Sequence, residues 1–204
     1  MSASCCNVPP SPGRDLSYRR ALWIALIANL AMFGVELAAS WWSGSSALAA
    51  DAADFLGDSA NYALSLGAIA LGGAWVSRVA LLKGGAMSLY GIGVLAYAGW
   101  RAWLGVPPEA LTMGAVGLLA LLVNAGVAVM LYRYRNGDAN MRSVWLCTRN
   151  DVIANFAVIA AAAGVFGSGT VWPDVAVAGL LAVLGLSSGR VVMRQAFAEL
   201  RGAV

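Results

Sequence analysis

The sequence predicts an all-α protein that crosses a membrane with six helices and keeps both chain ends in the cytoplasm. Of its 204 residues, 60% are hydrophobic and only 11% are charged, and the mean hydropathy is +0.74. A soluble domain could not bury so much apolar surface, whereas a bundle of membrane helices need not. Two further observations support the prediction: six apolar stretches have spanning length, and the basic residues are distributed unevenly between them.

Each predicted helix is an apolar stretch long enough to cross a hydrocarbon core of ~30 Å. Short runs of turn-forming residues separate most of these stretches. The runs are "SGSS" at 43–46, "GVPP" at 105–108, "NGDAN" at 136–140 and "GSGTVWP" at 167–173, with a less distinct break near Gly72. The predicted helices cover residues 18–42, 46–72, 77–104, 109–134, 142–166 and 172–198.

Basic residues set the predicted orientation. With the N-terminus inside, only Arg101 falls in an outer loop. The inner segments carry Arg14, Arg19, Arg20, Arg78, Lys83, Arg133, Arg135, Arg142, Arg190, Arg194 and Arg201. This bias is the positive-inside pattern, so the net charge of +3 reflects topology, and we infer no surface for nucleic acid. We expect a multi-pass protein of the cell's inner (cytoplasmic) membrane.

Residues 1–17 are predicted to be a disordered cytoplasmic tail, because the segment is polar and proline-rich and lacks the apolar core of a signal peptide. Cys5 and Cys6 are adjacent in it. A cytosolic location argues against a disulfide. The pair could capture or deliver metal, or it could belong to a tail with no binding role.

Polar side chains inside the predicted helices are concentrated in the second and fifth. The stretch "SALAADAADFLGDSANY" holds Asp51, Asp54 and Asp58 with no basic residue, although a carboxylate at bilayer depth costs at least ~2.5–3.5 kcal/mol. The other polar residues in the spans include Asn29, Glu36, Asn61, Asn124, Cys147, Arg149, Asn150, Asp151 and Asn155. Such residues are rarely kept in a membrane without a function.

Four of these side chains are spaced to meet. Asp54 and Asp58 are four residues apart, so they share one helix face, and Cys147 and Asp151 repeat that spacing on the antiparallel fifth helix. With a rise of ~1.5 Å per residue, Asp54 is expected at the level of Asp151, and Asp58 at the level of Cys147. The four groups should converge near the middle of the membrane.

Oxygen and sulfur donors in a set of four suit a tetrahedral dication such as zinc or cadmium. Calcium and magnesium would prefer more oxygen ligands and no sulfur. The Asp54–Asp58 pair could instead line a polar seam or a proton relay, and Cys147 could be a packing residue. Asp51, one turn further out, could be an accessory ligand or a packing acceptor. Asn29, Asn61, Asn124 and Asn155 are expected to make hydrogen bonds between helices rather than to bind metal.

An enzyme fits the pattern less well than a transporter. An intramembrane aspartyl protease could use paired aspartates, but two on one helix facing a cysteine suit metal ligation better than a dyad that shares a proton. A thiol redox protein would need a second cysteine near Cys147, and the predicted helices contain none. Arg149 is two residues from both Cys147 and Asp151, so we expect it on another face, paired with Glu36 or Asp51 or extended to the inner interface.

Two motifs resemble those of the cation diffusion facilitator family. "SGSSALAADAADFLGDSANYAL" is similar to its second-helix signature, and "CTRNDVIANFAVIAAA" to its fifth-helix motif, His-x-x-x-Asp followed by small residues. Cys147 stands at the histidine position, and the chain contains no histidine. The family's cytoplasmic regulatory domain has no counterpart here, so we expect the transmembrane domain alone.

The resemblance implies a secondary transporter that is not an enzyme, with residues 18–204 as a six-helix transmembrane cation transporter domain. It implies a transport site made of Asp54, Asp58, Cys147 and Asp151. It also implies that zinc or cadmium is exported from the cytoplasm in exchange for protons, as a substrate and not a cofactor. Accessory ligands would be Asp51, Cys5 and Cys6. A homodimer would be held by membrane helices, with 77–104 as the candidate face. A degenerate or regulatory relative, or a transporter of cobalt, nickel, manganese or iron, is the alternative.

Overall fold

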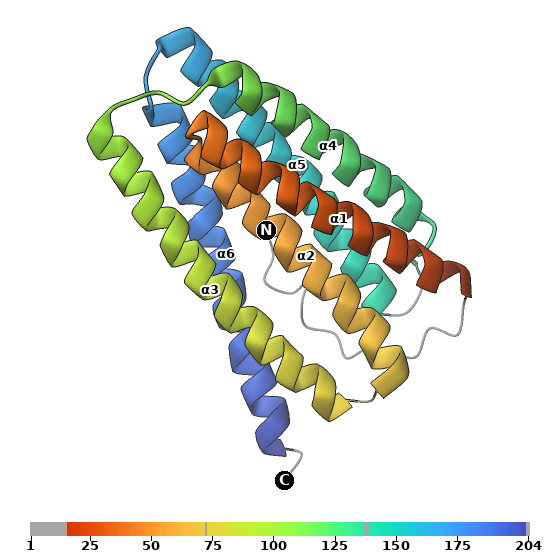
Figure 1. Cartoon of the computed structure of the whole chain (residues 1–204). Coiled ribbons are helices and arrows are strands. Elements are labelled where there is room, and N and C mark those ends of the chain that lie inside the picture. The colour runs from red at the N-terminus through yellow and green to blue at the C-terminus, as the bar shows by residue number, and fades with distance from the viewer. Residues whose placement is uncertain (1–15, 72, 137–138, 203–204) are drawn as a thin grey trace.

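The computed structural model describes residues 16–71, 73–136 and 139–202, and the regular structure in these residues is entirely helical (Figure 1). Residues 1–15 of the predicted tail, with Cys5 and Cys6, lie outside the described residues, whereas Leu16 and Ser17 belong to α1 and are helical. The helices are α1 Leu16–Ser43, α2 Ser46–Leu71, α3 Gly73–Leu104, α4 Ala110–Tyr132, α5 Ala139–Ser168 and α6 Trp172–Gly202. The predicted all-helical class is therefore confirmed. Helices α1, α3, α5 and α6 are each a few residues longer than predicted.

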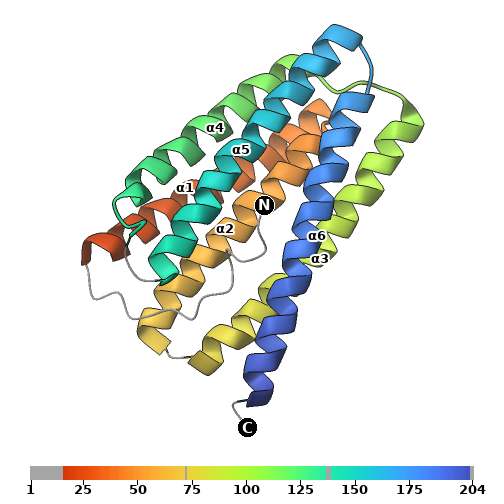
Figure 2. The ribbon, with the colours of Figure 1, turned by 180° about the vertical axis from the view of Figure 1, so that it is seen from behind.

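Helix α2 lies at the centre of the bundle. It packs against α1, α3, α5 and α6, whereas α4 packs against α1 and α5. Two views from opposite sides show α3 and α6 lying side by side as a long pair next to the other four helices (Figures 1 and 2). The most acidic helix is thus the one with the most neighbours.

The chain turns three times at one end of the bundle, which we call the outer end following the charge pattern. Residues 44–45, 105–109 and 169–171 make these turns, and each begins with a glycine of positive φ: Gly44, Gly105 and Gly169. At Gly44, a Cβ would also lie 2.5 Å from a terminal nitrogen of Arg101. The positive φ favours glycine there, and a larger residue would also have to displace the Arg101 guanidinium.

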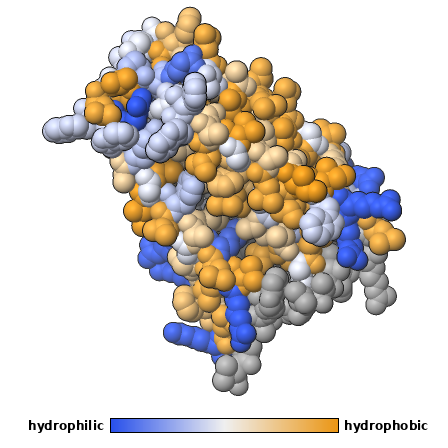
Figure 3. All heavy atoms as spheres, in the orientation of Figure 1, coloured by the Kyte–Doolittle hydropathy of each residue, from blue (hydrophilic) through white to orange (hydrophobic). Residues whose placement is uncertain are grey.

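The surface of the bundle suits a lipid environment. Five of the described helices are long and apolar enough to span a membrane, and α2 is the exception because of its aspartates. Since α1 ends at the outer end and α3 begins at the opposite, inner end, α2 has to cross between them. Hydrophobic side chains cover the middle of the face seen in Figure 3, and tryptophans near the outer end, such as Trp103 at 89%, are highly exposed. These features confirm a polytopic membrane protein.

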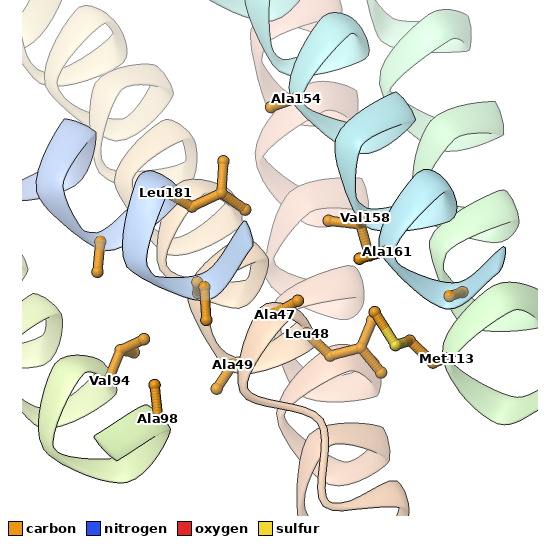
Figure 4. Close-up of a cluster of buried hydrophobic side chains, with 14 residues drawn as sticks. Ala47, Leu48, Ala49, Val94, Ala98, Met113, Ala154, Val158, Ala161 and Leu181 are labelled. Atoms are coloured by element: carbon orange, nitrogen blue, oxygen red, sulfur yellow. The ribbon is translucent and has the colours of Figure 1, made fainter. Parts of the chain in front are cut away.

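Two apolar clusters close the two halves of the interior. The outer cluster is rich in alanine, and in it Ala47 and Leu48 of α2 lie among α4, α5 and α6 (Figure 4). The inner cluster is bulkier and includes Tyr18, Leu22 and Tyr62. Most of the polar residues predicted to be functional lie between these clusters on the facing helices.

Glycines bring α3 and α6 close together. A Cβ on Gly84 would lie 2.6 Å from Met193, and a Cβ on Gly189 would lie 3.1 Å from the carbonyl oxygen of Gly84. Gly91 likewise faces Leu186 of α6. Part of the small-residue stripe predicted as a dimer face is therefore used for packing inside the chain.

Candidate metal site

Three aspartates lie on the inward-facing side of α2. Asp51, Asp54 and Asp58 are spaced by three and four residues, which places them on one face of the helix. Asp51 is 1% exposed and Asp58 is 7% exposed, while Asp54 is half-buried. The face that the sequence predicts to hold ligands therefore does point into the bundle.

The carboxyl groups of Asp58 and Asp151 lie in contact between α2 and α5. Beside them, the Tyr62 hydroxyl donates to Asp58 Oδ2 at 3.1 Å and lies 2.8 Å from Thr148 Oγ1. A shared proton or a cation would relieve the repulsion between two carboxylates in such a contact. The predicted meeting of the second and fifth helices is thus present at Asp58 and Asp151.

Two side-chain contacts describe the register of α2 against α5. Asn155 bonds to Asp51 toward the outer end, and Tyr62 contacts Thr148 toward the inner end. The first agrees with the predicted level pairing of Asp54 with Asp151, whereas the second is displaced from that pairing by about one turn. The expectation that Asp54 meets Asp151 and Asp58 meets Cys147 therefore stays a prediction.

Two buried carboxylate oxygens near the Asp58–Asp151 contact lack a hydrogen-bond donor in the part of the chain that the structure describes. Among the described residues, Asp54 Oδ2 and Asp151 Oδ2 are buried and have no hydrogen-bond donor. Asp54 also lies within electrostatic range of Asp51, Asp58 and Asp151. Buried acceptors without donors, crowded by other carboxylates, are a suitable environment for a cation.

Cys147 lies one turn inward of Asp151 on α5 and is half-buried. It immediately precedes Thr148, whose hydroxyl contacts Tyr62 of α2. Within the described ranges, no three side chains of Asp, Glu, Cys or His lie close enough together to hold a metal ion. The four-ligand set of Asp54, Asp58, Cys147 and Asp151 stays a prediction, with two of its members in direct contact.

A second polar network lies one to two turns further out. Asn155 donates a hydrogen bond to Asp51 Oδ2 at 2.8 Å and accepts one from Asn124 at 3.0 Å. Glu36 of α1 lies beside Asp51, and among the described residues neither of its buried carboxylate oxygens has a hydrogen-bond partner. Asp51 therefore accepts a bond between helices in this structure, and the network ties α2, α4 and α5 together. Asn29 instead bonds within its own helix, to the carbonyl of Ala25 at 2.9 Å, which corrects the expectation of an interhelical bond.

Lys83 is the residue that sequence reasoning misplaced. The charge pattern puts it at the inner surface, but its side chain is only 7% exposed and donates a hydrogen bond to Asn61 of α2. The misplacement arose because a lysine near a predicted helix end ordinarily extends to the interface. Asn61, three residues after Asp58, was the available signal, because its side chain can accept a hydrogen bond from a buried lysine.

Arg149 takes no part in the site. It is exposed, donates to Asn150 Oδ1 at 3.3 Å and lies over the ring of Trp145, with its guanidinium carbon 5.5 Å from the ring centre. The prediction that it faces away from the ligands is therefore confirmed, whereas pairing with Glu36 or Asp51 is ruled out in this structure.

Comparison with known families gives one result. Residues 22–201 match the family described as the cation efflux transmembrane domain, and this range includes every predicted ligand in the helices. No curated protein is significantly similar to the chain in sequence.

Proposed function

The chain belongs to the cation efflux family of membrane transporters, and from that membership we propose that it exports zinc and cadmium from the cytoplasm in exchange for protons. The family consists of transporters and not enzymes, which agrees with the sequence prediction. Its members move metal cations in general, so the choice of metal and the coupling to protons are our proposals.

The observation that carries the proposal is the pair Asp58–Asp151, with unpartnered oxygens of Asp54 and Asp151 at the same level. A divalent cation would supply the positive charge that these buried oxygens lack. With Cys147 one turn away, the donor set would be three carboxylates and one thiolate. Zinc accepts both donor types, and cadmium favours the sulfur more strongly.

Proton exchange follows from the same pair. Asp58 and Asp151 would share a proton while no metal is bound, and a metal ion could use these oxygens only after that proton leaves. Binding from the cytoplasm would therefore release protons, and protons arriving from the opposite side would favour release of the metal. An inward proton gradient would then drive export.

Both sides of the pair are closed in this structure. The alanine-rich outer cluster and the inner cluster around Tyr62 flank it, and Asp151 is only 6% exposed. Transport requires each side to open in turn, and we propose that helix pairs rock against one another to achieve this. We further propose the inner membrane as the location and a homodimer through membrane helices as the assembly.

The experiment that tests the function uses purified protein in sealed lipid vesicles. Asp54→Asn and Asp151→Asn should each abolish uptake of zinc and cadmium while leaving the yield of folded protein unchanged. Glu109→Gln is the matched control, because Glu109 is an exposed carboxylate outside the spans. Uptake that survives either aspartate substitution would place the site elsewhere. Absence of uptake by the unaltered protein would favour a regulatory relative.

The proton coupling has a separate measurement. A pH gradient imposed across the vesicles should drive metal against its own gradient, and metal flux should dissipate the pH gradient in turn. Metal flux that is indifferent to the gradient would contradict antiport and indicate a uniporter.

A further inference from the structure

Lys83 is a buried cation in the membrane-spanning part of α3. It is the only basic side chain classed as buried in the part of the chain that the structure describes. It lies ~15 Å along α3 from Gly73. Arg78, five residues earlier on the same helix, is exposed. Burying an ammonium group is unfavourable unless it is compensated by partners, so the surroundings of Lys83 should explain its position.

A short chain of contacts links Lys83 to the candidate metal site. The ammonium group donates a hydrogen bond to Asn61 Oδ1, and Asn61 lies beside the Asp58 carboxyl, three residues earlier on α2. Asp58 in turn lies in contact with Asp151. The ammonium of Lys83 attracts the Asp58 carboxylate electrostatically as well. The hydrogen bond to Asn61 thus holds the positive charge of Lys83 near Asp58.

Several carboxyl groups share this level with one buried ammonium. Asp54, Asp58 and Asp151 lie within electrostatic range of one another, and Lys83 attracts the Asp58 carboxyl. Lys83 can therefore offset part of the negative charge that these groups would carry between the apolar clusters.

We propose that Lys83 is a resident counter-cation of the transport site: it balances Asp58 and Asp151 while no metal is bound, and it weakens the binding of a divalent cation so that the cation can be released. The inference rests on the proposed function. A metal ion that enters would be repelled by the ammonium, and the flexible lysine stem would allow the charge to withdraw. Transport requires binding that is strong enough for capture and weak enough for release.

The first test measures cadmium binding to the full chain in lipid nanodiscs. Lys83→Met should lower the Kd at least about tenfold, since one opposing charge is removed from a poorly screened site. Lys83→Arg keeps the charge and should bind like the unaltered protein. Arg78→Met removes the same charge from an exposed position on the same helix and should also leave the Kd unchanged. A Lys83→Met variant with the Kd of Arg78→Met, or a weaker one, would overturn the proposal.

The second test needs no metal. Thermal unfolding of metal-free protein is measured for Lys83→Met, Asp58→Asn and the double variant. If Lys83 neutralises Asp58, Lys83→Met should lower the Tm, and the loss should largely disappear when Asp58 is already Asn. Additive effects would show that the two groups do not interact. If the unaltered protein binds no metal, the proposed function fails, and so does the proposal that Lys83 weakens metal binding. The metal-free cycle then still decides whether Lys83 balances Asp58.

Discussion

Asp174, in the first turn of α6, caps the N-terminus of α2 at Ser46, 128 residues earlier in the chain. Its Oδ2 accepts hydrogen bonds from the Ser46 amide at 2.8 Å and from the Ser46 hydroxyl at 2.6 Å. Its Oδ1 accepts from the Ser45 hydroxyl and from the Ala47 amide. The acceptor that caps a helix N-terminus usually belongs to an adjacent residue, whereas two amides at the start of α2 donate to Asp174 of another helix. The acidic helix is thereby fixed at its outer end to α6.

Replacing Asp174 by alanine should therefore destabilise the bundle. The substitution leaves buried donors of Ser46 and Ala47 without an acceptor, a loss of about 2 kcal/mol or more. Asp174→Asn keeps an oxygen acceptor of the same shape and should lose less. Unfolding followed by circular dichroism in detergent would measure both. Equal stability of Asp174→Ala and the unaltered chain would show that water satisfies these donors.

Glu109 caps α4 in a different setting, because it is exposed and belongs to the turn just before the helix. It accepts hydrogen bonds from the amides of Leu111 at 3.1 Å and Thr112 at 2.7 Å. The bonds from Thr112 hold the pKa of Glu109 below its usual 4.5. The ionised cap is favoured in the folded state, so its stabilisation is present above pH 4.5 and is lost as the pH falls through the lowered pKa.

The pH dependence of this cap can be isolated by difference. The Tm of the unaltered protein should exceed that of Glu109→Ala at neutral pH, and the gap should close well below pH 4.5. The comparison cancels the effect of acid on the buried carboxyl groups, which both proteins share. A gap that is the same at both pH values would mean that the charge of Glu109 contributes nothing.

Asn155 connects α2, α4 and α5, so replacing it should lower the free energy of unfolding more than replacing Asn29 does. Asn155→Ala would leave the Asp51 carboxyl and the Asn124 amide without their partner, at a cost of about 3 kcal/mol. Asn29→Ala removes a bond to Ala25 in the same helix and should cost about 1 kcal/mol. Chemical denaturation of the two variants side by side gives the comparison. A larger loss of stability in Asn29→Ala would show that the network around Asn155 contributes less to folding than the bond within α1.

The fold was largely predictable because its signals are local. Apolar length sets each helix, and turn-forming glycines such as Gly44 mark where it ends. The inward face of α2 was predictable from the spacing of its aspartates. These features depend on nearby residues in the chain, which is why the sequence was sufficient.

The features that escaped prediction are relationships between helices. The contact of Tyr62 with Thr148 depends on how far α5 is shifted along α2, and helix ends locate that only to within a turn. The burial of Lys83 depends on Asn61 facing it from another helix. The cap supplied by Asp174 depends on α6 returning to the start of α2. None of these has a spacing rule in the sequence.

Metal selectivity provides the sharpest prediction, because Cys147 replaces the histidine of similar transporters. A thiolate is a softer ligand than imidazole, so it should favour cadmium relative to manganese, cobalt or nickel, while zinc still binds. Cys147→His should shift the ratio of cadmium to zinc transport toward zinc and leave transport dependent on the aspartates. Cys147→Ser replaces sulfur by oxygen and should reduce cadmium transport more than zinc transport.

The measurement is competitive uptake of the two metals into vesicles. It is made with Cys5→Ser and Cys6→Ser already present, so that Cys147 is the only thiol in the chain. Val144, buried one turn earlier on α5, offers the control: Val144→Ile alters packing without changing any donor atom. If the ratio is unchanged in both Cys147 variants, Cys147 is a packing residue, and any metal is held by carboxylates alone. A ratio that shifts equally in Val144→Ile would show that helix packing, and not sulfur, sets the preference.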